Sequence, residues 1–399
     1  MNSILKNKKI ILGICGSIAA YKACELTSLL SKAGANVFVL MTQSALKFVG
    51  KESLRALSGN IVCVDTFDYL DPHKVNHIEI VKDADLLLIA PASANTIAKM
   101  ANGFADNMLT DVFLAATCPV AIAPAMNTNM WYNAATQTNV ESLSKRGCKF
   151  IGPVSGNLAC KTEGIGKFEE PNNIITSIIE LFSAKDFTKK VLITAGATCE
   201  DIDPVRFISN RSTGKMGLAL ASAAKMRGAD VCLLCGSNVQ NIPNAIYTER
   251  FRSTQDLYNL VTEKYKNFDV VIQCAAPADY TVLNYSAEKI KKGDSELNLL
   301  LKRTPDIAKT IGVTKRRNQI FIGFAAESSL DTTLAHKKLL DKNLDLIVYN
   351  NILKVGAGFA TDTNIATIIT KDYELELEKM SKFDLANTII DHILRLEEK

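Results

Sequence analysis

Two stretches of the chain open with the same pattern of polar and hydrophobic positions. Residues 8–17, KKIILGICGS, and residues 189–198, KKVLITAGAT, each place two lysines before a short apolar run that ends in glycine. Apolar strands then alternate with amphipathic stretches of helical length, the pattern of parallel α/β domains. The expected strands are residues 36–42, 60–65, 85–93, 119–127, 148–153, 230–237, 269–280, 319–328 and 344–351, with a hairpin at 365–378. The pattern predicts two α/β domains, residues 1–185 and 186–399, with their boundary in the polar stretch 183–190.

Length and composition agree with this division. A chain of 399 residues exceeds one ordinary core, so two domains of roughly 150 to 200 residues are expected. A hydrophobic fraction of 47% with 22% charged residues is typical of a soluble globular protein. The net charge of +4 forms no basic stripe, so nothing indicates nucleic-acid binding. No apolar run reaches membrane-spanning length and the N-terminus lacks a signal-peptide core, so we expect a cytoplasmic protein that does not bind membranes.

The ten cysteines are expected to be reduced thiols in that compartment. Cys232 and Cys235 have the CxxC spacing of redox and metal sites. They lie, however, in an apolar run between Asp230 and Gly236 that is typical of a strand, where positions i and i+3 point to opposite faces. We therefore interpret this pair as buried packing, and four histidines without a second cysteine cluster do not indicate a zinc site.

Polar and small residues gather where strands of the first half end. Ligands of open parallel sheets bind beyond the carboxyl ends of the strands. Gly13, Gly16 and Ser17 follow the first strand, and the segments PASANTIAKMANGFADNML (91–109) and PAMNTNMW (124–131) follow two later ones. The spacing of the glycines is not GxGxxG, so it does not indicate a dinucleotide fingerprint. A mononucleotide phosphate at the start of the helix stays open.

Residues 209–217, SNRSTGKMG, are similar to a phosphate-binding P-loop but lack two of its parts. Ser209 stands where the first glycine belongs, and Met216 stands where a hydroxyl should hold magnesium. A polar turn still leads into a helical pattern, and a helix N-terminus attracts anions. The segment predicts an anion site whose ligand the residues alone do not identify.

Several motifs together resemble known enzymes. GSIAAYK, PASANTIAKMANGFAD, PAMNTNMW and NLAC are similar to flavin-dependent cysteine decarboxylases. ITAGAT, DPVRFISNRSTGKMG, AAPADY and EKIKK are similar to phosphopantothenate-cysteine ligase. Their order on one chain resembles the bifunctional family of coenzyme A biosynthesis, phosphopantothenoylcysteine decarboxylase joined to phosphopantothenate-cysteine ligase. The resemblance implies a flavodoxin-like or Rossmann-like flavin domain followed by a Rossmann-like ligase domain.

For the first half, the resemblance implies an FMN cofactor and three catalytic residues. His77 matches the family's active-site histidine, Asn127 matches the residue that holds the substrate carboxylate, and Cys160 matches the proton donor on a flexible flap. The residues implied to bind FMN are Gly16, Ser17 and Ser44 at the phosphate, and Ala92, Ser93, Ala94 and Asn95 at the flavin.

The implied chemistry explains why a reaction without net oxidation uses a flavin. Oxidation of the substrate's cysteine thiol to a thioaldehyde creates an electron sink, so that carbon dioxide leaves and an enethiolate remains. The flavin then returns its hydride while Cys160 supplies a proton. Lys161, Lys167 and Phe168 depart from the family's Gly, Arg and Met, which leaves the closure of the flap in question.

For the second half, the resemblance implies activation of 4'-phosphopantothenate by CTP. Asn210 matches the residue that handles the acyl-cytidylate, and Lys289 matches the lysine that neutralises charge at the α-phosphate. Lys338 and Lys342, four apart on a predicted helix, would face one ligand. Magnesium is expected with the triphosphate, through unknown ligands. The residues implied to bind the nucleotide are Gln273, Cys274, Ala275, Asp279, Lys289, Pro305, Asp306, Ile307, Ala308, Phe324, Lys338 and Lys342.

The expected partners are small molecules and further copies of the chain. 4'-Phosphopantothenate, cysteine and CTP are the implied substrates, and the resemblance implies a homo-oligomer with a dimeric ligase half and a trimeric or larger decarboxylase half. Preference for CTP over ATP stays open. Two alternatives for the first half are a flavin-dependent prenyltransferase of the same fold and a regulatory subunit without catalysis. Asn127 and Cys160 argue against the prenyltransferase, and a regulator needs neither the cysteine nor an attached ligase.

Overall fold

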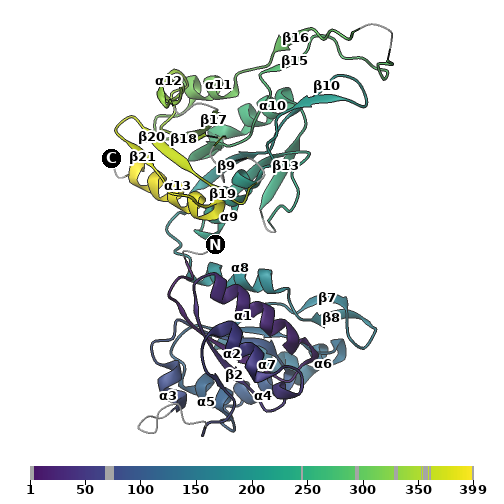
Figure 1. Cartoon of the computed structure of the whole chain (residues 1–399), viewed down its shortest axis with the longest axis vertical. Helices are drawn as coiled ribbons and strands as arrows, with labels where there is room; N and C mark the ends of the chain where they lie inside the picture. The colour runs from purple at the N-terminus through teal and green to yellow at the C-terminus, as the bar shows by residue number, and fades with distance from the viewer. Residues whose placement is uncertain are drawn as a thin grey trace. The chain divides into compact units, whose positions relative to one another are not determined.

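The computed structural model describes residues 4–67, 76–243, 246–292, 296–327, 331–351, 353, 358 and 361–397. The chain divides into two compact units, Met1–Phe182 and Ser183–Lys399 (Figure 1). Within the described residues, no helix has both the length and the apolar character needed to cross a membrane.

The first unit is built on a six-stranded parallel sheet in the order β3-β2-β1-β4-β5-β6. Its central strands β1 and β4 are almost wholly buried, as expected for a parallel sheet with both faces covered. A separate antiparallel hairpin, β7–β8, follows the sheet. The strands are β1 (Lys9–Ile14), β2 (Asn36–Met41), β3 (Val62–Cys63), β4 (Leu86–Ala92), β5 (Val120–Pro124), β6 (Lys149–Phe150), β7 (Val154–Asn157) and β8 (Glu163–Lys167).

Helices cover this sheet, and polar caps fix where several of them begin. Ser93 caps α4 by accepting a hydrogen bond from the Thr96 amide, and Asn107 forms a capping box with Thr110 at α5. The helices are η1 (Ile18–Tyr21), α1 (Lys22–Lys32), η2 (Ala45–Lys47), α2 (Lys51–Ser58), α3 (Asn76–Val81), α4 (Ala94–Ala101), α5 (Met108–Ala115), α6 (Thr128–Tyr132), α7 (Ala134–Lys145) and α8 (Pro171–Phe182).

The strand order of the first unit reverses between β1 and β4. This reversal is the topological switch point at which open α/β sheets bind ligands. The Cys15 amide after β1 donates to the Pro91 carbonyl of β4 at 3.1 Å, so the loops that follow these two strands lie together. The fold therefore brings the GSIAAYK and PASAN segments to one place.

The second unit contains an eight-stranded sheet in the order β13-β12-β9-β14-β17-β18-β20-β21. The first six strands are parallel, and β20 and β21 form the antiparallel hairpin that the sequence predicted. The strands are β9 (Lys190–Ala195), β12 (Asp230–Gly236), β13 (Tyr247–Phe251), β14 (Val270–Gln273), β17 (Ile320–Glu327), β18 (Leu346–Asn351), β20 (Ala366–Thr370) and β21 (Glu374–Glu376).

Helices lie on both faces of this sheet (Figure 1). Residues of α10, α11 and α12 share one hydrophobic core with the sheet, while α9 and α13 pack against each other and α9 against β9. The helices are α9 (Lys215–Met226), α10 (Thr254–Lys264), η3 (Tyr265–Asn267), α11 (Ile307–Thr314), α12 (Thr333–Asp341) and α13 (Lys382–Glu397). Both units are α/β units built on a largely parallel sheet, which agrees with the predicted fold class.

Two details of the predicted strands change. The expectation of one strand over residues 269–280 is wrong, because β14 ends at Gln273 and the amide of Ala275 turns to the Thr194 hydroxyl at 3.0 Å. Pro277 follows, and proline has no N–H for a sheet ladder. Residue 328, the last of another predicted strand, lies outside the described residues.

Short antiparallel pairs extend from the second unit. The first pair is β10 (Cys199–Asp201) with β11 (Phe207–Ser209), and the second is β15 (Tyr280–Val282) with β16 (Leu301–Arg303). A third pair joins β19 (Thr363–Asn364) to β22 (Met380–Ser381). Figure 1 shows β15 and β16 in an arm at the top of the view. We refer to described residues 280–303 as the β15–β16 arm.

Ion pairs join the beginning and the end of the second unit. Arg227, at the end of α9, pairs with Asp186 at 2.6 Å and with Asp391 of α13 at 2.5 Å. Lys189 pairs with Glu397 at 2.9 Å. Its first and last described segments therefore lie side by side.

The cysteines agree with the expectation of reduced thiols. None of the ten forms a disulfide among the described residues. Cys232 and Cys235 are both buried in β12, and burial raises the pKa of Cys232 to about 11. The interpretation of this CxxC spacing as strand packing is confirmed.

Candidate functional site

A cavity of about 770 Å³ opens at the switch point of the first unit. We call it the Cys160 cavity. Met126, Met130 and Phe168 supply part of its apolar wall. The predicted site residues that line it are Gly16, Ser17, Ser93, Ala94, Asn127 and Cys160.

The loops that contain Gly16 and Ser44 approach each other closely at the end of this cavity where the phosphate is predicted to bind. A Cβ atom at position 16 would lie 2.4 Å from the Cβ of Ser44, so only glycine lets the two loops approach. The Ser17 hydroxyl accepts a hydrogen bond from the Ala19 amide at 3.3 Å and caps η1. The structure thus brings together the three residues expected at the phosphate.

The four residues expected at the flavin lie at the β4–α4 junction. Ser93 and Ala94 line the cavity at the start of α4, where helix amides favour a polar ligand. Ala92 is buried at the end of β4, and Asn95 is exposed in the first turn of α4. Neither of these two residues is among those that line the cavity.

Asn127 and Cys160 are in contact although 33 positions separate them in the chain. The Asn127 side chain donates from Nδ2 to Cys160 Sγ at 3.4 Å, while its Oδ1 accepts from the Asn129 amide at 2.8 Å and caps α6. The Met126 amide donates to the Gly166 carbonyl at 3.0 Å and ties the β7–β8 hairpin to the end of β5. The hairpin therefore holds the thiol beside the carboxamide.

The surroundings of Cys160 favour its thiolate. Hydrogen bonds from the Thr162 side chain, the Thr162 amide and the Asn127 side chain lower the pKa of Cys160. Its Sγ lies 3.1 Å from the Thr162 hydroxyl. An exposed thiol with a lowered pKa is a better proton donor than an ordinary cysteine.

The three departures from the family pattern all lie on the hairpin or directly after it. Lys161 has a φ of 63°, in the left-handed region that glycine adopts readily, so the family's glycine suits this turn better. Lys167 and Phe168 both line the cavity; Lys167 lies 3.6 Å from Glu170, and Phe168 is 3% exposed. The turn nevertheless forms, because Lys161 donates its amide to the Leu158 carbonyl at 2.9 Å.

His77 is not among the residues that line the Cys160 cavity. It lies on α3, which packs against α5. Its Nδ1 atom is buried and has no hydrogen-bond partner among the described residues. Within the first unit, His77 therefore lies outside the cavity that contains Asn127 and Cys160.

A cavity of about 390 Å³ in the second unit gathers most of the predicted nucleotide residues. We call it the Asp306 cavity. The predicted residues that line it are Gln273, Asp279, Pro305, Asp306, Ile307, Ala308 and Lys342. Sequence reasoning missed Pro277, Ala278, Tyr280, Arg303 and Thr304, which lie in or beside the motifs used for the prediction.

The Asp306 cavity has a helix N-terminus on one side and a buried amide on another. Asp306 caps α11 by accepting from the Lys309 amide at 3.0 Å, and it also accepts from Lys342 Nζ at 3.2 Å. Gln273 is 9% exposed, and its Oε1 atom has no partner among the described residues. A ligand with a hydrogen-bond donor would satisfy this buried acceptor.

Five predicted nucleotide residues do not line this cavity: Cys274, Ala275, Lys289, Phe324 and Lys338. Burial raises the pKa of Cys274 to about 12, so this thiol stays neutral. Lys338 pairs with Glu327, whereas Lys342 pairs with Asp306. Lys342 is the C-terminal cap of α12, and its amide donates to the Lys338 carbonyl at 3.1 Å, so the two lysines lie one turn apart. That they face one ligand stays a prediction.

Asn210 and Lys289 lie on segments that Asp203 and its neighbours hold in place. Asn210 donates from Nδ2 to the carbonyls of Ala276 and Pro277 at 3.2 and 3.0 Å. Asp203 accepts from the amides of Val205, Arg206 and Ile290, which tie the arm to the β10–β11 hairpin. Lys289, one residue before Ile290, is exposed.

Asp203 is ionised throughout the ordinary pH range. Desolvation opposes its charge, but hydrogen bonds from the Val205 and Arg206 amides and the Arg206 side chain lower the pKa of Asp203 to about 2. This anchor holds the backbone next to Lys289 and leaves the lysine side chain outside the Asp306 cavity.

Comparison with known proteins gives the same division of the chain. Residues 2–183 match the family described as flavoprotein, and residues 187–396 match the family described as DNA/pantothenate metabolism flavoprotein C-terminal domain. The coenzyme A biosynthesis bifunctional protein CoaBC of Bacillus subtilis (strain 168) is 46% identical, with 99% of each chain covered.

Two further relatives match smaller parts of the chain. A cysteine/cysteine sulfinic acid decarboxylase from an unknown prokaryotic organism is 43% identical over 86% of this chain and 98% of its own. The crystal structure of the C-terminal domain of a CoaBC protein has 39% identity and a TM-score of 0.46, and the match covers 54% of this chain and 100% of that domain. With its motifs in this order and its full-length relatives, the chain belongs to the family of bifunctional coenzyme A biosynthesis proteins.

Proposed function

We propose that this chain carries out two consecutive steps of coenzyme A biosynthesis. The first is CTP-dependent ligation of cysteine to 4'-phosphopantothenate through an acyl-cytidylate. The second is FMN-dependent decarboxylation of 4'-phosphopantothenoylcysteine to 4'-phosphopantetheine. Residues 1–185 form the decarboxylase domain and residues 186–399 the ligase domain. The contact between Asn127 and Cys160 at the Cys160 cavity is the observation that carries the proposal.

In the decarboxylase domain, Asn127 binds the carboxylate that leaves and Cys160 supplies a proton to the carbon that remains. A carboxamide binds a carboxylate without adding an opposite charge, so it does not hold back a group that departs as neutral carbon dioxide. Met126, Met130 and Phe168 exclude water around the reacting carbon. His77 belongs to the proposed catalytic set as well, with its buried Nδ1 atom free to bind a further group.

The Cys160 cavity fits FMN. The close approach of Gly16 to Ser44 leaves a cradle of the kind that phosphate-binding loops use, and apolar side chains form the wall beside Ser93 and Ala94. When bound, FMN accepts two electrons from the substrate thiol and later returns them. We expect the purified protein to be yellow with one FMN per chain; flavin retained by residues 191–399 alone would contradict this assignment.

In the ligase domain, the Asp306 cavity takes the nucleotide and Asn210 the acyl-cytidylate. Attack of the 4'-phosphopantothenate carboxylate on the α-phosphate of CTP releases pyrophosphate, and the cysteine amine then displaces CMP. Lys289 neutralises the charge that develops at the α-phosphate. Cys274, Ala275, Phe324 and Lys338 stay in the proposed nucleotide set through the resemblance of their motifs.

Magnesium accompanies the triphosphate in this proposal. Among the described residues, no group of three or more His, Cys, Asp and Glu side chains could hold a metal ion. Magnesium usually takes one or two carboxylates with substrate phosphates and water. The phosphates of CTP therefore supply most of its ligands.

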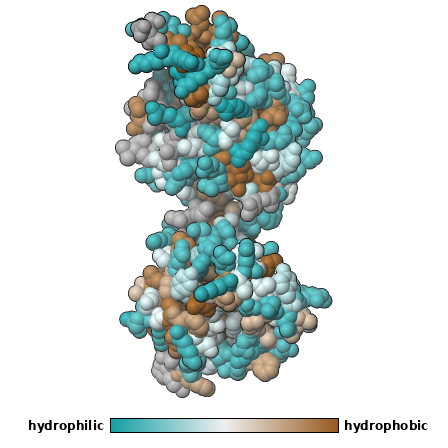
Figure 2. Space-filling model, turned by 90° about the vertical axis from the view of Figure 1, so that its right-hand side faces the viewer, coloured by the Kyte–Doolittle hydropathy of each residue, from teal (hydrophilic) through white to brown (hydrophobic). Residues whose placement is uncertain are grey.

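The proposed homo-oligomer uses exposed apolar residues of each domain. The β15–β16 arm exposes Leu300 to 71% and Leu297 and Tyr285 to 56% each, and hydrophobic residues gather at the top of the view in Figure 2. Exposed apolar clusters mark interaction sites, so we assign the arm to a ligase dimer. Ile18 and Tyr21, exposed beside the Cys160 cavity, are assigned to a decarboxylase trimer or larger multiple.

The cytoplasm is the proposed location. Ten cysteines with no disulfide among the described residues fit a reducing compartment.

One assay tests the proposed function against its alternatives. The purified chain is given 4'-phosphopantothenate, cysteine and CTP, and pyrophosphate and carbon dioxide are followed together. We expect both products in equal amounts, with 4'-phosphopantetheine identified by mass. A prenyltransferase or a regulatory flavoprotein would release no carbon dioxide from 4'-phosphopantothenoylcysteine. Release from free cysteine instead would assign the chain to cysteine decarboxylation.

A further inference from the structure

The described residues that line the Cys160 cavity include two lysines and no carboxylate. Lys22 is the first residue of α1, and Lys167 is the last residue of β8. The polar residues that line the rest of the cavity, such as Ser17 and Asn127, are neutral. The roles proposed above for Asn127, Cys160 and FMN use neither lysine, so the function of these two positive charges is still to be explained.

The carboxylate of Glu170 joins the two lysines. Lys22 Nζ donates to both carboxylate oxygens of Glu170, at 3.0 and 2.9 Å, and Lys167 Nζ lies 3.6 Å from its Oε1 atom. The hydrogen bond from Lys22 lowers the pKa of Glu170. The two ammonium groups therefore converge on one point, where an anion with more charge than a carboxylate would be attracted more strongly.

The exposure of these side chains indicates which of them can leave the pair. The Lys22 side chain is 17% exposed, whereas that of Glu170 is 51% exposed. Ion pairs of exposed groups are weak, so Glu170 can turn to water at little cost. The charge of Lys22 stays in a mostly buried place, where it requires an anion beside it. Another anion can therefore take the place of Glu170.

Lys167 is held on the side of the cavity that contains the proposed reacting residues. The Gly166 carbonyl accepts a hydrogen bond from the Met126 amide at 3.0 Å. Gly166 precedes Lys167 and Met126 precedes Asn127, so this one bond fixes the backbone at both residues. Lys167 also ends the β7–β8 hairpin whose turn contains Cys160. A substrate with its carboxylate at Asn127 can therefore extend a flexible chain towards Lys167.

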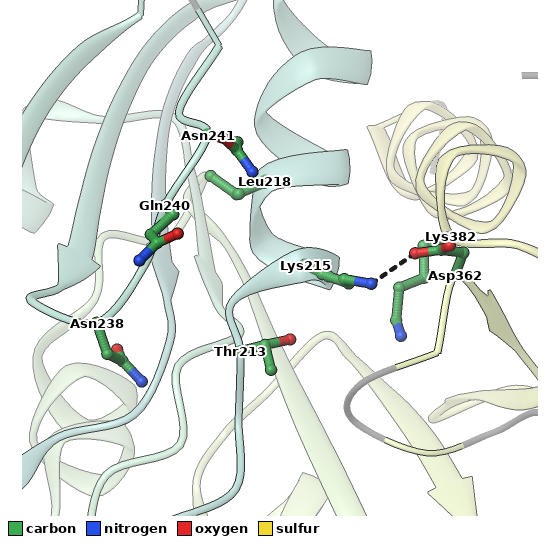
Figure 3. Close-up of a pocket in the computed structure, with 8 residues that line it drawn as sticks. All are labelled: Thr213, Lys215, Leu218, Asn238, Gln240, Asn241, Asp362 and Lys382. Atoms are coloured by element: carbon green, nitrogen blue, oxygen red, sulfur yellow. Dashed lines mark hydrogen bonds and ion pairs between the residues drawn. The ribbon is translucent and has the colours of Figure 1, made fainter.

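A cavity of about 510 Å³ in the second unit shows what distinguishes the two lysines of the Cys160 cavity. It is lined by Lys215 and Lys382 and also by Asp362, as Figure 3 shows. Asp362 Oδ1 lies 2.7 Å from Lys215 Nζ, and Lys382 Nζ donates to the carbonyls of Gly358 and Thr361. That cavity thus contains the carboxylate that pairs with its lysine. Glu170, by contrast, is not among the residues that line the Cys160 cavity, so the positive charge faces the cavity.

We propose that Lys22 and Lys167 bind the 4'-phosphate of the decarboxylase substrate and select it over unphosphorylated pantothenoylcysteine, and that Glu170 competes with this phosphate for both lysines. The inference rests on the proposed decarboxylase function. A phosphate monoester carries between one and two negative charges near neutral pH and has three acceptor oxygens, so it matches two ammonium groups better than a carboxylate does. The FMN phosphate is assigned to the cradle at Gly16 and Ser44, which leaves the two lysines to the substrate.

The test compares the phosphorylated substrate with its unphosphorylated form. Carbon dioxide release by the full-length, FMN-loaded chain is measured with 4'-phosphopantothenoylcysteine and with pantothenoylcysteine, and the two kcat/KM values give a selectivity ratio. We expect Lys22→Met and Lys167→Met each to lower this ratio about 10- to 100-fold, mainly through KM, because each removes a charge-assisted hydrogen bond. Glu170→Gln removes the competing charge and should raise the ratio about two- to fivefold.

Two further variants show whether the effect belongs to charge at this place. Lys167→Arg restores the arginine of the family pattern and should keep the ratio within about threefold of the wild type, because a guanidinium group also binds phosphate. Lys32→Met, at an exposed lysine at the other end of α1, is the matched control and should leave the ratio unchanged.

Three results would overturn the inference. Equal losses with both substrates would mean that the lysines only hold the hairpin in place, and an unchanged ratio would mean that they do not contact the phosphate. Loss of bound flavin from Lys22→Met after gel filtration would assign Lys22 to the FMN phosphate instead. The more exposed Lys167 keeps the test valid if Lys22→Met fails to fold. If the wild-type chain releases no carbon dioxide, the proposed function fails, and calorimetric titration of the same variants with 4'-phosphopantetheine and pantetheine still tests the two lysines.

Discussion

The two units differ in how completely each assembles its predicted site. In the first, Gly16, Ser93, Asn127 and Cys160 line one cavity, and the thiol already touches the carboxamide. In the second unit, some predicted residues line the Asp306 cavity and Lys289 lies on the exposed β15–β16 arm. The other predicted residues belong to neither place. In the first unit, a backbone hydrogen bond to Gly166 holds the short β7–β8 hairpin, and with it Cys160, beside Asn127. In the second unit, Lys289 lies on a long arm that is held by the bond between Ile290 and Asp203.

This contrast has a chemical consequence. Decarboxylation needs one substrate and a proton donor, which a single cavity can bring together. Ligation brings together a nucleotide, an acid and an amine, which arrive in sequence. We infer that the part of the first site formed by Asn127 and Cys160 is already assembled, although His77 lies outside it, whereas the second site is completed when its substrates bind.

The largest expected effect comes from Cys160→Ser. A hydroxyl is far less acidic than a thiol, so the first reaction should stop after carbon dioxide has left, with an enethiol product and reduced flavin. General acid catalysis contributes roughly a hundred- to ten-thousand-fold, and we expect the rate of phosphopantetheine formation to fall by that factor. Flavin absorbance without oxygen and product mass provide the measurement.

Asn127→Asp sharpens this test because it should fail earlier. A second carboxylate repels that of the substrate, so neither flavin reduction nor carbon dioxide release should occur. Phosphopantetheine formation by Cys160→Ser at the wild-type rate would mean that the proton comes from water or another residue.

The next largest effect is expected for Lys289→Gln. Loss of one preorganised charge at a transition state costs about a hundred- to a thousandfold in rate, so CTP-dependent pyrophosphate release should fall by about that much. Decarboxylation of supplied phosphopantothenoylcysteine should be unchanged. Lys302→Gln, an exposed lysine on β16, is the control, and equal rates in both variants would make Lys289 an ordinary surface charge.

Gly16→Ala should weaken FMN binding. The new methyl group would meet Ser44 at 2.4 Å, and overpacking of this kind costs about 1–3 kcal/mol, or roughly a five- to hundredfold loss of affinity. Gly50→Ala is the matched control, because no atom lies within 4 Å of its added Cβ and its φ is −75°. Flavin content after dialysis measures the difference. Equal flavin content in both variants would contradict the assignment of the FMN phosphate to Gly16.

Thr162→Val should have the smallest effect. The Thr162 hydroxyl is the leading cause of the lowered pKa of Cys160, so its loss raises that pKa and reduces the thiolate fraction at neutral pH. Alkylation of Cys160 should therefore be slower than in the wild type below the ordinary thiol pKa, and the two rates should converge above it. Peptide mass spectrometry against pH measures this, with Thr176→Val, whose hydroxyl bonds only within α8, as control. Identical profiles of alkylation rate against pH for the wild type and Thr162→Val would show that the Thr162 hydroxyl does not lower the pKa of Cys160.

The sequence predicted the layers of the fold better than the details of the ligase site. Apolar runs such as those of β1 and β9 identify buried strands, and the resemblance of the motifs placed Asn127 and Cys160 on one site. The sequence did not reveal that Lys342 follows the last residue of α12, because a helix end depends on tertiary contacts. Lys382 gave no signal either, since its partners are the carbonyls of Gly358 and Thr361, which no residue type identifies.

The ion pairs from Arg227 to Asp186 and Asp391 and from Lys189 to Glu397 give the second unit adjoining ends. Such a unit can be attached to another protein or inserted into a surface loop without stretching its own fold. Gene fusion between two enzymes of one pathway then requires only a linker. The same closure makes the unit a suitable subject for circular permutation, with new termini at a surface turn such as that between β20 and β21.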